Sequence, residues 1–463
     1  MKSKKISKLF YLSFILIFWI LIFTLTCKNP SGPGIDFNLR NWYIMSGMAA
    51  GPGFTNNITY GNNTEINPAN YMTQKKDMLF TNNTAGKIYY RIPALLTLQN
   101  GDILAFADKR YGGAGDLPNQ IEVYVRKSTN NGTNFNAEKR ITPQSTSKKD
   151  GHGDTAVVLD KKTGHILALV AAGQGFVQST PHDPIRIKVI RSKDNGETWE
   201  APIDITSQVY GNGCKDPTRR YWYGAFVSSG NGLQMRNGRI MFIINVRESS
   251  STSATSFRNY ALYSDDGGYK WKVSRGSPKN PRGGNEAKVA ELNDGSLLMH
   301  IRWTPNRLQS RSYDYGETWT DATVINGIPA SHSNGDLIVY TSKKNKYDRD
   351  RLITLVDKRP WGNNKRACSC KGVGNCSAGY PGCPTFYVSY DEGYTWTNSK
   401  KLYANHAGYS SLAILKDGSI GILAELGNSW NGPIYFLKAS IEWCNPNDNP
   451  CSPTNSSVSV KKK

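Results

Sequence analysis

The octapeptide SYDEGYTW, from Ser389 to Trp396, places a hydroxyl, a carboxylate and an indole within eight residues, a set that could serve an active site. The motif recurs, however, as SKDNGETW from Ser192, SDDGGYKW from Ser264, SYDYGETW from Ser312 and a degenerate STNNGTNF from Ser128. Because an active site is normally built once, five copies indicate architecture rather than catalysis. As a turn, the Asp would accept hydrogen bonds from backbone N–H groups one or two residues on. The Gly would supply a positive φ, and the Trp would pack back onto the sheet.

The spacing of the copies indicates repeated sheets. They begin 64, 72, 48 and 77 residues apart, whereas a β-propeller blade takes roughly 40–50 residues, so some intervals hold more than one blade and its loops. Between them, short apolar runs such as ILAFA, HILALV and GRIMFIINV alternate with turn residues, as strands and hairpins do. No long helical apolar spacing follows the first 30 residues. The sequence therefore predicts an all-β propeller.

The charge balance favours acidic partners. Lys and Arg number 57 against 36 Asp and Glu, which gives a net charge of +21. Such a balance suits nucleic acid, anionic membranes or acidic glycans, or is simply a solubilising surface. The basic residues are dispersed and no nucleic-acid-binding module accompanies them, so we expect no nucleic-acid partner.

The N-terminus predicts export. The basic segment MKSKKISK precedes an apolar run from Leu9 to Thr26, and Cys27 follows at once. This pattern is typical of a signal or membrane anchor. It resembles a bacterial lipoprotein signal with Cys27 as the lipidated residue, although Thr26 is larger than the usual Gly or Ala. The alternative is an uncleaved anchor helix. Either predicts a chain tethered in the bacterial cell envelope, facing the cell surface or the periplasm.

Export changes how the other cysteines are interpreted. Four of them lie in a Gly-rich segment, at Cys368, Cys370, Cys376 and Cys383. Their spacing lacks the paired C-x2-C units of structural zinc sites, so two loop disulfides are favoured over a metal. Cys444 and Cys451 are close enough in sequence to bridge each other, which leaves Cys214 unpaired.

Several segments in a fixed order resemble the exo-α-sialidases (neuraminidases) of bacteria, whose repeats are known as Asp boxes. The segments are YYRIPALL, AFADKRY, HGDTAVV, GNEAKVAEL, HIRW and GYSSLAIL with ILAE. The resemblance implies a six-bladed β-propeller with Asp-box repeats, as a monomeric catalytic domain over residues 82–445. Residues 1–27 would be the anchor, 28–81 a polar lead-in and 446–463 a polar tail.

The resemblance implies three arginines that bind the carboxylate of sialic acid. A guanidinium can grip a carboxylate with two hydrogen bonds and stays charged at any working pH. Arg91 of RIP and Arg302 of HIRW match the first two. Arg366 fits the third best, but the spacing departs from the family pattern there, so Arg359 and Arg351 remain alternatives.

The catalytic residues are also implied by the resemblance. An anionic nucleophile would be repelled by the substrate carboxylate, and sialidases use a tyrosine, which Tyr409 matches. A phenol with a pKa near 10 needs a base, and Glu286 matches it. Asp116, on a Gly-rich loop, matches the acid that protonates the leaving oxygen and then activates water.

Three further residues would line or support the pocket. Arg110 would lie near the ring oxygens, and Asp154 would line the N-acetyl side. Glu425 would hold Arg91, because a buried arginine without an acidic partner is unfavourable.

The expected function is retaining hydrolysis of terminal sialic acids on glycoproteins, glycolipids and mucins, through a tyrosyl intermediate and without a cofactor or catalytic metal. Loop-bound Ca²⁺ stays open. Three alternatives remain: a sialic-acid-binding adhesin, a non-enzymatic Asp-box propeller, and a transferase of the same mechanism.

Overall fold

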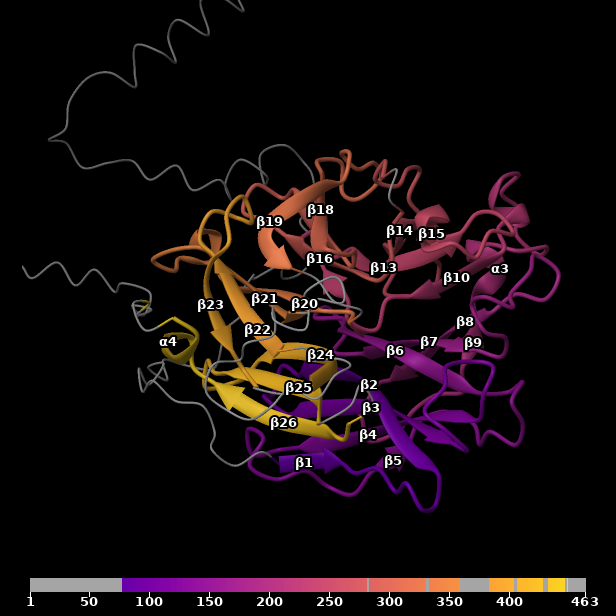
Figure 1. Ribbon diagram of the computed structural model, residues 1–463, viewed down its shortest axis with the longest axis horizontal. Coiled ribbons are helices and arrows are strands. Elements are labelled where there is room, and N and C mark those ends of the chain that lie inside the picture. Colours follow the sequence, from indigo (N-terminus) through magenta and orange to yellow (C-terminus); the bar gives the residue numbers. More distant parts are fainter. Residues whose placement is uncertain are drawn as a thin grey trace, which may run out of the picture. The chain divides into compact units, whose positions relative to one another are not determined.

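The computed structural model describes residues 77–280, 283–329, 333–358, 383–403, 406–427, 432–445 and 448. Within these ranges the main strands form six sheets arranged in a ring, each built mainly from four strands (Figure 1). This confirms the all-β propeller that the repeats predict and the six blades that the family resemblance implies. The expected anchor, including Cys27, lies outside the described residues. In the described part of the chain, no helix is long and apolar enough to cross a membrane.

Consecutive strands form most of each blade. The first blade contains β2 (Ile88–Thr97), β3 (Ile103–Tyr111), β4 (Ile121–Ser128) and β5 (Lys139–Arg140). The second contains β6 (His152–Leu159), β7 (Ile166–Ala172), β8 (Arg186–Ser192) and β9 (Ile203–Asp204), with β11 (Gly230–Asn231) parallel to β6. The third contains β10 (Gly224–Val227), β13 (Ile240–Arg247), β14 (Phe257–Ser264) and β15 (Lys272–Val273), with β12 (Leu233–Gln234) beside β13.

The remaining blades follow the same pattern. The fourth contains β16 (Ala287–Glu291), β17 (Leu297–Ile301), β18 (Asn306–Ser312) and β19 (Thr323–Pro329). The fifth contains β20 (Asp336–Thr341), β21 (Arg351–Lys358), β22 (Cys383–Ser389) and β23 (Thr397–Lys401). The sixth contains β24 (His406–Ile414), β25 (Ile420–Gly427), β26 (Ile434–Ala439) and β1 (Asp77–Phe80). Short helical turns are α3 (Thr206–Val209), α4 (Ile441–Cys444) and the 3-10 turns Arg219–Tyr221, Ala254–Ser256 and Lys343–Asn345.

The sixth blade takes its outer strand from the other end of the chain. β1 pairs with β26 in antiparallel register, Asp77 opposite Phe436. Its residues Leu79 and Phe80 are buried. The propeller therefore includes residues that the sequence analysis places in the polar lead-in, 28–81. The sequence does not reveal this strand because DMLF is only four residues long.

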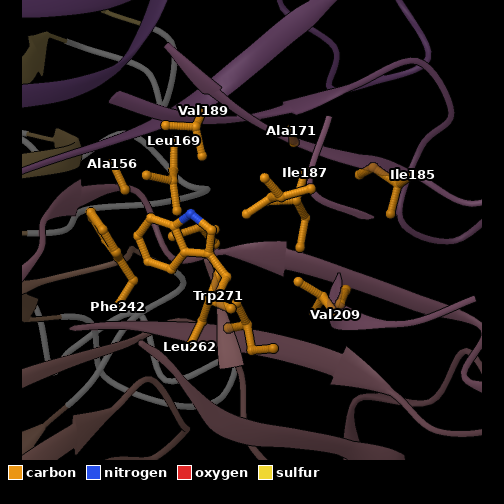
Figure 2. Packing of buried hydrophobic residues seen from close by; sticks show 14 of the residues in the cluster. Ala156, Leu169, Ala171, Ile185, Ile187, Val189, Val209, Phe242, Leu262 and Trp271 are labelled. Carbon is orange, nitrogen blue, oxygen red and sulfur yellow. The ribbon is translucent and has the colours of Figure 1, made fainter. Parts of the chain in front are cut away.

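The second strand of each blade is buried over most of its length because it packs between neighbouring blades. All residues of β7 and of β13 are buried. Figure 2 shows how the blades interlock: Trp271, at the end of an octapeptide, lies between Leu169 and Val189 of the second blade and Phe242 of its own.

The octapeptides are turns between the third and fourth strands, but their hydrogen bonds differ from the expected ones. Asp314 Oδ1 accepts from the backbone N of Thr318 at 2.9 Å and Oδ2 from its hydroxyl at 2.6 Å. The acceptor therefore serves a residue four positions on, not one or two. The reason is that Tyr315 and Gly316, with φ of 59° and 88°, turn the chain back toward Asp314.

The Gly of the octapeptide also permits close packing between blades. Gly268 has a φ of +84°, and a Cβ there would lie 2.4 Å from Leu167 Cδ1 in the preceding blade. Trp271 Nε1 donates to the Gly268 carbonyl at 3.1 Å. Each turn follows the third strand of a blade, which runs antiparallel to the second. The turn therefore lies at one end of the blade, and the residues that end the second strand, such as Arg110, lie at the other. The motif is thus architectural.

The expected disulfides can be checked only in part, because the structure describes Cys214, Cys383 and Cys444 but not the other cysteines. Cys214 and Cys444 are buried free thiols among the described residues, and Cys383 begins β22 rather than lying within a loop. The other partners that the sequence suggests, Cys368, Cys370, Cys376 and Cys451, lie outside the described residues.

Candidate active site

In the first strands of three blades, the pairing register shifts beside a candidate site residue. The shifts lie between Arg91 and Ala94 in β2, around Asp154 in β6, and around Tyr409 in β24. An extra residue in a strand bends it and re-aims its side chains. Ile92 and Asp154 have φ of 58° and 54°. A positive φ is an outlier for the β-branched Ile92, and any residue other than glycine in this conformation stores about 1–3 kcal/mol of strain.

Glu425, in the middle strand β25, joins two of these irregular strands. Its Oε1 accepts from the backbone N of Ile92 at 2.7 Å, and its Oε2 accepts from the backbone N of Tyr409 at 3.0 Å. The same Oε2 accepts from Arg91 Nη2 at 3.3 Å. Glu425 is 1% exposed, so its carboxylate depends on these three donors in place of water. The sequence analysis anticipates the contact with Arg91 but not the two backbone contacts.

Tyr409, Glu286 and Arg302 form one hydrogen-bonded cluster. The Tyr409 hydroxyl donates to Glu286 Oε2 at 2.7 Å, and Arg302 Nη1 donates to the Tyr409 oxygen at 2.8 Å. Arg302 also pairs with Glu286 through side chain and backbone. Glu286 is 2% exposed. Burial, reinforced by the charge of Glu286, raises the pKa of Tyr409 well above 10, although Arg302 and Arg91 act against it.

Two guanidinium groups flank the phenol. Arg91 Cζ lies 5.3 Å from the centre of the Tyr409 ring, and Arg302 Cζ lies 5.9 Å from it. The pair presents positive charge beside a hydroxyl that is already hydrogen-bonded to a carboxylate. A bound anion would therefore be held next to a nucleophile with a base in place.

Asp116 lies on the loop after β3 and contacts Arg91, one of the two arginines beside the phenol. Its Oδ1 accepts from Arg110 Nη1 at 2.6 Å and lies 3.8 Å from Arg91 Nη1. Arg110 Nη1 also donates to the carbonyl of Ala114, which anchors the loop. The Asp116 side chain is 71% exposed, whereas Arg110 is fully buried. The Asp116 carboxyl is thus exposed to a ligand while buried Arg110 fixes the position of its loop.

The three aspartates around Arg110 differ in how readily they ionise. Loss of hydration disfavours the charged form of Asp116, but the charges of Arg110, Arg91 and Arg302 outweigh it and lower the pKa of Asp116. Burial, with repulsion from Asp108 and Asp116, raises the pKa of Asp154 well above 3.8. Burial likewise raises the pKa of Asp108 to about 6, although Arg110 counteracts it.

Asp108 is a site residue that the sequence analysis misses. Its Oδ2 accepts from Arg110 Nη2 at 3.1 Å and from the backbone N of Asp154 at 3.2 Å. It is fully buried and supports the irregularity of β6 as Glu425 supports those of β2 and β24. The signal was available: Asp108 and Arg110 are two apart in one strand, so their side chains share a face.

The structure addresses one of the three candidates for the third arginine, Arg351. Arg351 is buried and its donors are occupied by Asp448 at 2.7 and 2.8 Å, by Asp348 at 2.8 and 3.1 Å and by Thr341 at 3.0 Å. It is therefore not available for a ligand carboxylate. Arg366 and Arg359 lie outside the described residues.

The residues that the structure describes contain no group of three His, Cys, Asp or Glu side chains placed to hold a metal ion. The acidic side chains of the site instead face arginines. This arrangement can bind an anionic group at Arg91 and Arg302, with the Tyr409 hydroxyl and the Asp116 carboxylate both close to Arg91.

Residues 92–359 match the family described as BNR repeat-like domain. The chain is 30% identical over 361 residues to a sialidase of Bacteroides fragilis, which covers 73% of this chain and 60% of that protein. The chain thus spans less than two thirds of that relative.

Solved structures agree on the fold. Hadza microbial sialidase Hz136 superposes with a TM-score of 0.61 and 26% identity, over 76% of this chain and 66% of that one. A leech intramolecular trans-sialidase, with 2,7-anhydro-Neu5Ac bound, superposes with a TM-score of 0.63 and 18% identity, over 80% and 71% of the two chains. At that identity the second likeness concerns the fold alone.

Proposed function

Since the chain belongs to the BNR-repeat sialidase family, we propose that it is an exo-α-sialidase that hydrolyses terminal sialic acids of glycoconjugates with retention of configuration. One observation carries the proposal: the Tyr409 hydroxyl donates to Glu286 Oε2 at 2.7 Å, between Arg91 and Arg302. A hydroxyl, a base and two cations together suit attack on a carbon that bears a carboxylate.

In the first half of the proposed reaction, Arg91 and Arg302 bind the substrate carboxylate. Tyr409 passes its proton to Glu286 Oε2 while its oxygen bonds to the anomeric carbon. Asp116 gives its proton to the glycosidic oxygen, whose bond to that carbon breaks, and the aglycone leaves.

In the second half, a water molecule attacks the anomeric carbon and gives one proton to Asp116. The bond to the Tyr409 oxygen breaks, and that oxygen recovers its proton from Glu286. Sialic acid leaves and every group has returned to its starting state. The third arginine, for which Arg366 or Arg359 is proposed, would add to carboxylate binding.

Product analysis tests this proposal. In ¹H NMR of 3′-sialyllactose cleavage, the first sialic acid to appear should be the α anomer, which then mutarotates. First appearance of the β anomer would contradict a covalent intermediate. Accumulation of an anhydro sugar, or of sialic acid on added lactose, would replace hydrolysis by the transferase alternative.

We also propose that the N-terminal segment tethers the chain to the bacterial cell envelope through a lipid on Cys27, as the apolar run before that residue suggests. Metabolic labelling with a palmitate analogue should mark the natural chain and not Cys27→Ala. Label on neither chain, with both membrane-bound, would favour the uncleaved anchor helix, and label on both would contradict lipidation at Cys27.

A further inference from the structure

A cavity of about 410 Å³ opens in the second blade, beside the candidate site. Its walls come from the approach to β6, the end of β7 and the segment that leads into β8, so it lies at the same end of the blade as Asp154. A volume of this order suits one sugar unit or its charged group. Its lining consists of Lys149, Asp150, His152, Ala172, Gly173, Gln174, Asp183, Pro184, Arg186 and Lys188.

The cavity adjoins the loop that carries Asp116. A Cβ at Gly151 would lie 2.1 Å from the carbonyl oxygen of Asn119, and one at Gly175 would lie 2.2 Å from that of Leu117. The two glycines therefore let the cavity wall touch the backbone of the Asp116 loop directly. Because Asp116 is proposed to protonate the departing oxygen, the aglycone must lie on the side of this loop.

The ionised groups of the cavity favour an anionic ligand. Asp150 already accepts hydrogen bonds from Ser145, Thr146 and Ser147. Asp183 accepts from Gln174. Within the described ranges, by contrast, Lys149 and Lys188 have no carboxylate within ion-pair distance. Their positive charges are thus left for a ligand.

His152 orients one of these lysines. It is 4% exposed, and its Nε2 lies 3.1 Å from Lys188 Nζ. An ammonium group can only donate, so Nε2 must be the acceptor and the ring must be neutral with its proton on Nδ1. Burial, together with the charge of Lys188, lowers the pKa of His152 to about 4. The imidazole therefore holds Lys188 at the cavity without competing with an anion.

Resting on the sialidase activity proposed above, we propose that this cavity binds a second negative group carried by the aglycone. The group is an oxyanion, supplied either by the carboxylate of a penultimate sialic acid or by a sulfate ester on the neighbouring sugar. Lys188 and Lys149 bind it, and His152 is a positioning residue.

The test compares kcat/KM on three substrates: 3′-sialyllactose, its α2,8-disialyl counterpart and its sulfated counterpart. The natural chain should prefer at least one doubly charged substrate by about fivefold or more at low salt, and the preference should shrink as salt screens the lysines. The substrate that shows the preference names the source of the oxyanion. Lys188→Gln should abolish the preference. Lys193→Gln, at the opposite end of β8 and paired with Glu200, is the matched control and should retain it.

A preference that survives Lys188→Gln, or no preference in the natural chain, would overturn the proposal while leaving sialidase activity intact. If no substrate is cleaved, calorimetric titration with sulfated lactose, which lacks sialic acid, still tests whether the cavity binds an oxyanion. Saturable binding that is lost in Lys188→Gln and kept in Lys193→Gln supports the cavity, and no binding to the natural chain refutes it.

Discussion

At the scale of single residues, the two groups proposed to exchange protons with substrate lie in opposite environments. Burial keeps the Tyr409 phenol protonated, so it needs Glu286 as an acceptor. The arginines keep Asp116 ionised in the free protein. A substrate carboxylate between Arg91 and Arg302 would offset their charge, so substrate binding itself should raise the pKa of Asp116 and favour its acid form.

The raised pKa of Asp154 gives a stability test. For a carboxyl whose pKa is raised on folding, the stabilising contribution is fully present below the unfolded value near 3.8 and is lost as pH rises through the folded value. Asp154→Asn removes this titration. We therefore expect the melting temperature of the variant, relative to the natural chain, to increase between pH 4 and pH 8. A constant difference across that range would show that Asp154 ionises normally.

At the scale of elements, the site depends on irregular strands held by buried carboxylates. Glu425 binds the backbone of β2 and β24 and also Arg91, so it sets the positions of a cation and of the phenol together. The contact with β2 is not local in sequence, since Ile92 and Glu425 lie in the first and last blades, whereas Tyr409 lies in β24, the strand next to β25.

Glu425→Gln should therefore affect both stability and catalysis. An amide would aim a donor at N–H groups and leave Arg91 without its buried partner, which destabilises by roughly 3–5 kcal/mol. We expect a lower denaturation midpoint in urea and at least a tenfold lower kcat/KM. Glu200→Gln, on a partly exposed carboxyl, is the control. Loss of stability with unchanged kcat/KM would mean that Glu425 is purely structural.

The sequence predicts the elements that have a strong local signal. Apolar runs such as ILAFA and GRIMFIINV predict β3 and β13, because both faces of these strands are buried. The two-residue strands and β1 are too short to give such a signal, and β1 pairs with a segment from the other end of the chain. The register shifts at Arg91 and Tyr409 lie within hairpins and leave no pattern of apolar residues that would reveal them. Asp108 could have been found from its spacing to Arg110 in one strand, but the contacts of Glu425 with the backbone are visible only in three dimensions. Arg351 was a candidate from the sequence, but Asp448 and Asp348 occupy its guanidinium.

At the scale of the whole molecule, the ring is closed by pairing β1 with β26 across almost the whole chain. The site draws on β2 of the first blade, the start of the fourth and β24 of the sixth. Closure of the sixth blade onto the first therefore bears directly on the geometry around Arg91 and Tyr409.

Phe80 tests how much this closure stabilises the molecule. It is 1% exposed and packs against Tyr90, with ring centroids 5.3 Å apart. Phe80→Ala should lower the free energy of unfolding by about 3–5 kcal/mol. Met78→Ala, in the same strand but 45% exposed, should change it little. Equal effects of the two substitutions in a urea titration would show that β1 contributes no buried packing.

The central claim is that Tyr409 is the nucleophile of a sialidase, and the most direct measurement is kcat for release of fluorophore from 4-methylumbelliferyl α-sialoside by the natural chain and by Tyr409→Phe. The phenylalanine keeps the ring beside Arg91 and Arg302 but removes the oxygen bonded to Glu286. We predict turnover by the natural chain and a loss on the order of 10³-fold or more in the variant, with an unchanged circular dichroism spectrum. Turnover by Tyr409→Phe at the natural rate would contradict the account.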